Sequence, residues 1–216
     1  MRLIRAVIFD LDGVIVESEN AHIEAEKQTF LKYGVRISSE ELHKYTGTTA
    51  KVMFTELIRK YRLNTTFEEI SGQKEDTLFR LLKEDAEPTK GITALLRELK
   101  SKRIKLAIGS SSTKKQIKYV LNKLEIAHIF NCVVGAEDIV NSKPDPEIFL
   151  KAAAELNANP SECLVVEDSK LGVEAAKRAH MKCVGYRNPN SGNQDLSRAD
   201  IITDDFSRLD IEALLH

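Results

Sequence analysis

Short segments made almost only of apolar residues recur along the chain, and most are followed by a stretch with the spacing of an amphipathic helix. These segments are residues 6–9, 104–108, 132–134 and 164–166, with weaker candidates at 183–186 and 201–202. A strand that is apolar on both faces is covered on both faces, which is typical of a parallel sheet. The predicted helices between them are 92–101, 113–124, 145–156 and 170–180. The sequence therefore predicts an α/β fold with a doubly wound parallel sheet.

The segment 16–86 interrupts this alternation. It has no convincing strand, and its apolar residues recur near helical spacing. Thr65 and Glu68 have the spacing of a capping box at a helix start. We therefore expect a helical cap formed by 16–86 and a Rossmann-like catalytic core formed by 1–15 and 87–216. An insert directly after the first strand should lie over the sheet edge where open α/β folds bind ligands, as a lid does.

Composition and charge exclude several classes of protein. Of the 216 residues, 42% are hydrophobic and 30% are charged, as in ordinary soluble proteins. A net charge of −1 does not suit a nucleic-acid-binding protein, and no apolar run has the roughly 20 residues of a membrane span. The three scattered cysteines indicate reduced thiols. We expect a cytoplasmic protein without nucleic-acid or membrane partners, and a monomer, with a dimer left open.

Polar side chains stand where the predicted strands end. These residues are Asp10 and Asp12 after the first strand, Ser110 after the second, and Glu167 and Asp168 after the fourth, with Lys143 before a helix start. The carboxyl ends of parallel strands share one edge of the sheet, so we expect these side chains to meet. Crowded carboxylates repel unless a cation joins them, and oxygen ligands suit Mg²⁺. The sequence predicts a magnesium site beside donors for phosphate oxygens.

Asp10 and Asp12 are two positions apart, so in an extended chain both project to one side. One carboxylate can attack phosphorus and form an acyl phosphate, while the other serves as general acid. Lys143 can neutralise charge on the transferring group. Simpler interpretations stay open for each residue: the aspartates and Ser110 could cap helices, and Lys143 could be a surface lysine.

Four short motifs carry a resemblance to a known superfamily. They are Asp10-Leu11-Asp12-Gly13-Val14, Gly109-Ser110, Lys143-Pro144 and Glu167-Asp168-Ser169. In this order and spacing they resemble the four motifs of the haloacid dehalogenase superfamily, and the helical insert resembles its type I cap. The chain is most similar to the beta-phosphoglucomutase-like branch, which includes sugar-phosphate and phosphoglycolate phosphatases.

The resemblance implies a role for each motif residue. Asp10 would be the nucleophile, Asp12 the general acid and base, and Ser110 and Lys143 the residues that hold the phosphoryl group. The implied metal ligands are Asp10, the carbonyl group of Asp12, Asp168 directly and Glu167 through a water molecule. A true dehalogenase is disfavoured, because that branch needs no metal and lacks the acid at the position of Asp12.

The cap residues bear on the substrate. His22 matches a histidine that helps position the acid in mutases of this branch, although a helical histidine without a function is also common. Those mutases dock a second phosphate with two cap cations, and Thr46 and Ala50 stand in their places. The candidates for substrate contact are Ser111, His22, Thr46 and Gly47, and the three other than His22 could simply be loop residues.

These observations predict a Mg²⁺-dependent phosphatase. It would hydrolyse small phosphomonoesters, such as sugar phosphates, through an aspartyl phosphate on Asp10. The main alternative is a beta-phosphoglucomutase-type isomerase with the same first step. A less favoured alternative is a sensor of phosphorylated metabolites that has no activity, which would usually have lost the aspartates.

Overall fold

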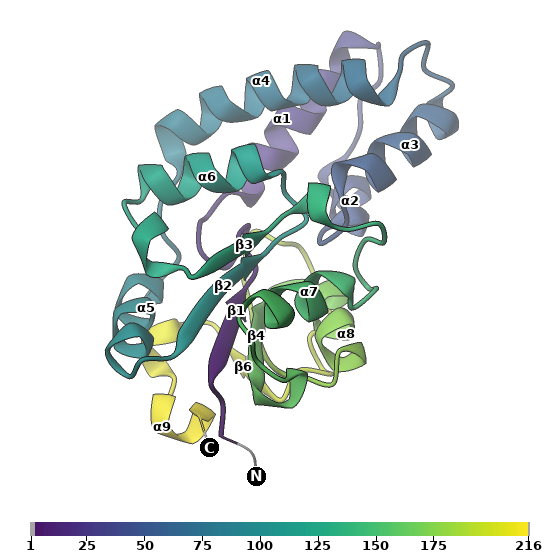
Figure 1. Ribbon diagram of the computed structural model, residues 1–216. Helices are drawn as coiled ribbons and strands as arrows, with labels where there is room; N and C mark the ends of the chain where they lie inside the picture. The colour runs from purple at the N-terminus through teal and green to yellow at the C-terminus, as the bar shows by residue number, and fades with distance from the viewer. Residues whose placement is uncertain (1–2, 216) are drawn as a thin grey trace.

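The sheet lies at the centre of the molecule, and helices cover both of its faces (Figure 1). The computed structural model describes residues 3–215. All strand pairs are parallel, and the strand order is β3-β2-β1-β4-β5-β6. The strands are β1 Ala6–Phe9, β2 Lys105–Gly109, β3 Cys132–Val134, β4 Cys163–Glu167, β5 Lys182–Tyr186 and β6 Ile201–Thr203. The predicted α/β fold with a parallel sheet is confirmed.

Two apolar layers explain why the strands consist mostly of apolar residues. Val7 and Phe9 of β1 pack in one cluster, and the alternate residues Ala6 and Ile8 pack in the other. The helices of the core are α5 Ile92–Ser101, α6 Lys114–Lys123, α7 Glu147–Glu155, α8 Lys170–Arg178 and α9 Ile211–Leu215. Helices α5, α6 and α9 contribute to the first cluster, and α7 and α8 contribute to the second. Both faces of the sheet are therefore buried, as the continuous apolar runs require.

Helices alone make up the regular structure between β1 and α5. They are α1 Glu19–Lys32, α2 Ser39–Leu42, α3 Ala50–Tyr61 and α4 Phe67–Asp85, with a 3-10 turn after α2. They share an apolar cluster of their own, in which Phe30, Phe54 and Ile70 are fully buried. The predicted capping box of Thr65 and Glu68 is wrong by one residue, since Thr66 and Glu69 make the two reciprocal hydrogen bonds.

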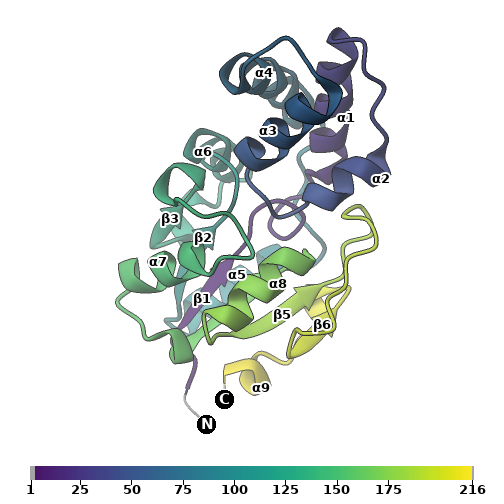
Figure 2. The ribbon, with the colours of Figure 1, turned by 90° about the vertical axis from the view of Figure 1, so that its right-hand side faces the viewer.

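Two neighbouring segments connect these helices to the sheet. Glu17 donates its N–H to the carbonyl oxygen of Glu87 at 2.8 Å, and Val16 pairs with Pro88 in an antiparallel bridge. The four helices lie beyond the carboxyl ends of the strands, as both views show (Figures 1 and 2). This placement fits a cap, and the division into core and cap residues given above stays our proposal.

No helix within residues 3–215 combines the length and the apolar character needed to cross a membrane.

Candidate active site

A buried lysine joins two carboxylates at the ends of β1 and β4. Lys143 Nζ lies 2.8 Å from Asp10 Oδ1 and 2.5 Å from Glu167 Oε1. The side chains of Lys143 and Glu167 are fully buried, and that of Asp10 is 9% exposed. Such charges are tolerated inside a protein only when they are paired and hydrogen bonded. The structure therefore brings these three residues together, as we expected, and Lys143 is not a surface lysine.

Glu167 has no free oxygen. Its Oε1 accepts from Lys143, and its Oε2 accepts from the backbone N–H groups of Asp168 and Ser169 and from Ser169 Oγ, each at 2.9 Å. Gly172 makes room for this carboxylate, because a Cβ atom there would lie 1.8 Å from Glu167 Oε1. A carboxylate with this many partners is better suited to hold a metal through a water molecule than to bind it directly.

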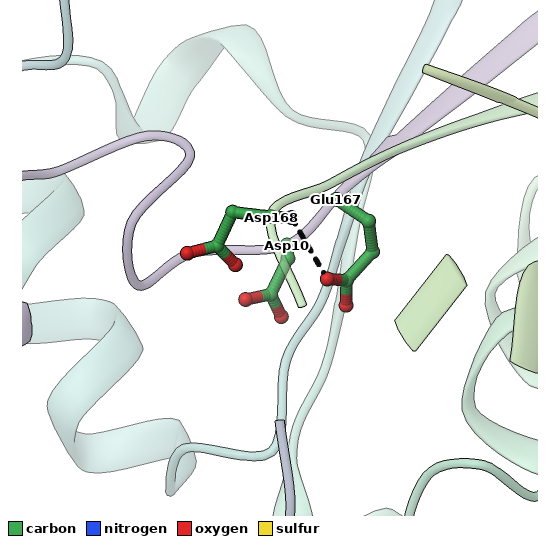
Figure 3. A group of neighbouring side chains, drawn as sticks. All are labelled: Asp10, Glu167 and Asp168. Atoms are coloured by element: carbon green, nitrogen blue, oxygen red, sulfur yellow. Dashed lines mark hydrogen bonds between the residues drawn. The ribbon is translucent and has the colours of Figure 1, made fainter. Parts of the chain in front are cut away.

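Three carboxylates converge at the sheet edge. One oxygen from each of Asp10, Glu167 and Asp168 lies within 4.8 Å of the others (Figure 3). Burial raises the pKa of Asp10 to about 7, with further contributions from Glu167 and Asp12 that Lys143 partly offsets. Burial also raises the pKa of Asp168, together with the charges of Glu19 and Glu167. A divalent cation would relieve this repulsion, and the oxygen-only donors suit a hard ion, so the residues fit a metal site.

Asp12 projects elsewhere, and its carboxylate is not a member of this group. Ser18 Oγ donates to Asp12 Oδ1 at 2.6 Å, His22 Nε2 lies 3.1 Å from the same oxygen, and Ser112 Oγ donates to Oδ2 at 2.5 Å. Burial alone would raise the pKa of Asp12, but the interaction with His22 and these hydrogen bonds outweigh it and lower the pKa. A metal role for Asp12 would therefore have to use its backbone carbonyl group.

Lys74 continues this chain of contacts into the cap. Its Nζ atom lies 2.9 Å from His22 Nδ1 and 3.8 Å from a carboxylate oxygen of Glu26. An ammonium group can only donate, so His22 Nδ1 accepts, and the ring hydrogen on Nε2 points to Asp12. The structure thus holds His22 in the tautomer that donates to Asp12.

The sequence interpretation missed Lys74 and Glu26. A usable signal was present for Lys74, because Ile70, Lys74 and Leu78 are four residues apart and share one face of α4. All three are buried. A charged residue within an apolar stripe of a helix indicates a buried partner.

The cap loop 46–49 touches the core directly. Ser111 Oγ donates to the carbonyl oxygen of Gly47 at 2.7 Å, and the N–H of Thr49 donates to Ser142 Oγ at 2.9 Å. Gly47 has a φ of 87°, and a Cβ atom there would lie 2.5 Å from Ser169 Oγ. Ser111 and Gly47, both predicted to contact substrate, contact each other in this arrangement. They close the site by bringing cap and core together.

A cavity of about 620 Å³ lies between cap and core. Its lining includes most of the predicted site residues: Asp10, Asp12, His22, Thr46, Gly47, Ser110, Ser111 and Asp168. Ser110 is buried, and its Oγ accepts from the N–H of Ser112 at 3.1 Å. Lys143 and Glu167 are not among the described residues that line the cavity, because Lys143 is held against Asp10 and Glu167.

Comparison with known proteins decides the family. Residues 7–186 match the sequence model of a family described as haloacid dehalogenase-like hydrolase. The chain belongs to this family. It is 34% identical to a phosphorylated carbohydrates phosphatase of Thermotoga maritima, over 81% of each chain. It is 32% identical to the beta-phosphoglucomutase of Bacillus subtilis, over 98% of this chain and 94% of that one.

A solved structure gives the same answer for the fold of this haloacid dehalogenase-like hydrolase. The crystal structure of CbbY from Rhodobacter sphaeroides in complex with phosphate superposes with a TM-score of 0.87 at 26% identity, covering 96% of each chain. The predicted resemblance, including the beta-phosphoglucomutase-like branch, is therefore confirmed.

Proposed function

We propose that this hydrolase is a Mg²⁺-dependent phosphatase that acts on small phosphorylated metabolites. One observation carries the proposal. Asp10 and Asp12 line the same cavity, with Asp10 beside a buried lysine and Asp12 beside a histidine of fixed tautomer. This is the arrangement that a nucleophile and a general acid on neighbouring positions require.

In the first step a carboxylate oxygen of Asp10 attacks phosphorus and forms an acyl phosphate. The bond from phosphorus to the leaving oxygen breaks, and the leaving alcohol takes a proton from Asp12. Because the pKa of Asp12 is lowered in this site, Asp12 would first take up that proton from the monoanionic phosphate group of the substrate. Ser110 and Lys143 hold the phosphoryl oxygens, and their donors stabilise the charge that develops there. In the second step Asp12 takes a proton from water, the water oxygen attacks phosphorus, and free phosphate leaves Asp10.

Mg²⁺ would be held by Asp10 and Asp168, by the carbonyl oxygen of Asp12, and through water by Glu167. When bound, it neutralises charge on the phosphoryl group and on the neighbouring carboxylates. Closure of the cap over the site would keep bulk water away from the acyl phosphate.

The charges in the cavity favour a phosphatase over a mutase. Thr46 and Ala50, which line the cavity, carry no charge. Two lysines of the cap line it too: His22 and Glu26 already engage Lys74, and Lys51 is the candidate partner for a second phosphate. The other acidic cap residues in the lining are Glu19 and Glu75. A second phosphate would therefore meet few charge-assisted partners. Each hydrogen bond from such a partner would contribute about 1.5–3 kcal/mol to its binding.

Product analysis tests this proposal. We expect β-glucose 1-phosphate and a panel of phosphomonoesters to release inorganic phosphate with Mg²⁺, and to release none in excess chelator. Glucose 6-phosphate formed without phosphate release would instead establish the mutase. Ligand binding without turnover of any substrate would favour a sensor.

The contact between Lys74 and His22 makes a second prediction. Lys74→Met removes the donor that fixes the ring, so Asp12 loses an oriented partner, and kcat should fall about 10- to 100-fold. KM should change much less, since the contact does not involve substrate. Steady-state kinetics measure both constants, with Lys115→Met as the control. Lys115 of α6 pairs at the surface with Glu75 of α4, and its loss should leave kcat unchanged. A larger effect on KM than on kcat would contradict the positioning role.

A further inference from the structure

The loop between β5 and β6 brings a buried serine to the candidate site. This loop extends beyond the strand ends toward α2 (Figure 2). Ser191 lies in the loop, is fully buried, and donates its hydroxyl hydrogen to Oδ2 of Asp168. Within residues 3–215 no other group donates a hydrogen bond to this carboxylate, and no lysine or arginine pairs with it. Ser191 is therefore the one described hydrogen-bond partner of the Asp168 carboxylate.

The surroundings of Asp168 make that partner important. Asp168 converges with Asp10 and Glu167 to within 4.8 Å, but Lys143 pairs with those two carboxylates and not with Asp168. Like charges this close repel one another. Rotation of the side chain to another staggered conformation would turn the Asp168 carboxylate away from the other two. The hydrogen bond from Ser191 opposes that rotation.

Buried amide groups fasten the loop to the segment that follows β1. Asn188 Nδ2 donates to the carbonyl oxygen of Gly13 at 2.9 Å and to Glu17 Oε2 at 3.1 Å. Asn190 Nδ2 donates to the same oxygen of Glu17 at 3.2 Å, and its N–H donates to Asn188 Oδ1 at 2.7 Å. The hydroxyl group of Ser191 is therefore held at a defined place beside the end of the sheet.

Gly13 makes room for the hydrogen bond between Ser191 and Asp168. It has a φ of 75°, and a Cβ atom there would collide with Asp168 Oδ2 and lie 3.1 Å from Ser191 Oγ. The segment after β1, the residue that follows β4 and the loop after β5 thus meet at one point. This close approach leaves little freedom for the Oδ2 side of the carboxylate.

We propose that Ser191 is a positioning residue that orients the carboxylate of Asp168 for binding the divalent cation. The inference rests on the proposed metal site of the phosphatase and adds to it a residue outside the four motifs. Ser191 is not among the residues that line the cavity, although Asp168 is, so Ser191 acts through Asp168. Residues that hold metal ligands by hydrogen bonds typically affect metal affinity about 10- to 100-fold.

Thermal melts at a series of Mg²⁺ concentrations, without substrate, test this role. An ion that binds only the folded protein raises the Tm by mass action, so the concentration that gives a chosen rise in Tm follows the dissociation constant. We expect Ser191→Ala to need about 10- to 100-fold more Mg²⁺ than the wild type for the same rise. With saturating Mg²⁺, kcat for p-nitrophenyl phosphate should stay close to that of the wild type.

A matched serine serves as the control. Ser207 Oγ donates to Asp205 Oδ1 at 2.7 Å, and neither residue lines the cavity. Ser207→Ala removes the same kind of hydrogen bond and should respond to Mg²⁺ as the wild type does. Ser191→Cys keeps a side chain of similar size with a weak S–H donor, so its Mg²⁺ requirement should lie between those of Ser191→Ala and the wild type.

Two results would overturn the inference alone. Ser191→Ala could melt at a lower temperature but respond to Mg²⁺ as the wild type does, which would mean that Ser191 only stabilises the loop. A fall in kcat at saturating Mg²⁺, with an unchanged Mg²⁺ requirement in the melts, would also contradict the positioning role. If Ser191→Ala gives no cooperative melt, Ser191→Cys replaces it, and a Mg²⁺ requirement equal to that of the wild type then overturns the role.

Failure of the proposed function has a different signature, because it concerns the wild type. A wild-type Tm that does not respond to Mg²⁺ would mean that the proposed metal site has failed, and the inference about Ser191 would fail with it. A wild type that responds to Mg²⁺ but releases no phosphate from any phosphomonoester would refute the phosphatase. The melts would still decide whether Ser191 positions Asp168.

Discussion

Asp10→Asn should lower kcat by at least about 10⁴-fold, the scale seen when a catalytic nucleophile is removed. The amide side chain of asparagine cannot form the acyl phosphate, so the first step of the reaction is lost. Phosphate release from a phosphomonoester in the presence of Mg²⁺ measures the effect. Substrate binding should persist, since Ser110 and Lys143 remain in place.

The same variant should keep its fold. Asparagine has nearly the shape of aspartate, and Lys143 keeps its contact with Glu167 at 2.5 Å. Asp204→Asn is the matched control, because Asp204 is an exposed aspartate that pairs with Arg208, and its kcat should not change. Rapid acid quenching with radiolabelled substrate should trap label on the wild type and none on Asp10→Asn. Activity above a tenth of the wild type would rule out Asp10 as nucleophile.

The core of the site could be predicted because its signals are local. An apolar strand that ends in a carboxylate places that carboxylate at the sheet edge whatever the rest of the chain does. Asp10 after β1 and Glu167 at the end of β4 follow this rule. The strand bounds were also close, since the predicted 104–108 became Lys105–Gly109.

The cap side of the site could not be predicted in the same way. Whether Lys74 is exposed or buried depends on how α4 packs against α1, and no pattern within α4 states which helix covers it. The contact between Ser111 and Gly47 likewise depends on how far the cap closes over the core. The one-residue error at Thr65 has a local cause, because Thr65-Thr66 and Glu68-Glu69 offer the same spacing twice.

Lys143→Met should both destabilise the protein and remove most of its activity. Methionine keeps the length of the buried side chain but leaves Asp10 and Glu167 without their shared cation. Breaking a buried pair in this way costs about 3–5 kcal/mol of unfolding free energy. We expect kcat to fall about 10²- to 10³-fold as well, since a donor to the phosphoryl oxygens is lost. Urea unfolding in chelator and phosphate release measure the two effects.

The destabilisation should grow as the pH rises from 5 to 8. Burial raises the pKa of Asp10 to about 7 in the folded wild type, although Lys143 holds it down. The pKa of this carboxyl group is higher in the folded than in the unfolded protein. The free energy of unfolding therefore falls as the pH rises above the unfolded-state pKa, because the buried group must ionise. Without Lys143 this pKa rises further, so the difference between variant and wild type is smallest at pH 5 and largest at pH 8.

Two further measurements isolate the buried cation as the cause. Lys177→Met removes a lysine that pairs with Asp200 near the surface, and this change should cost less than about 1 kcal/mol at every pH. Mg²⁺ should restore part of the stability of Lys143→Met, because an ion that binds only the folded state stabilises it by mass action. The loss of unfolding free energy in Lys143→Met could instead be equal at pH 5 and pH 8 and insensitive to Mg²⁺. That result would mean that the packing of the Lys143 side chain, and not its charge, stabilises this site.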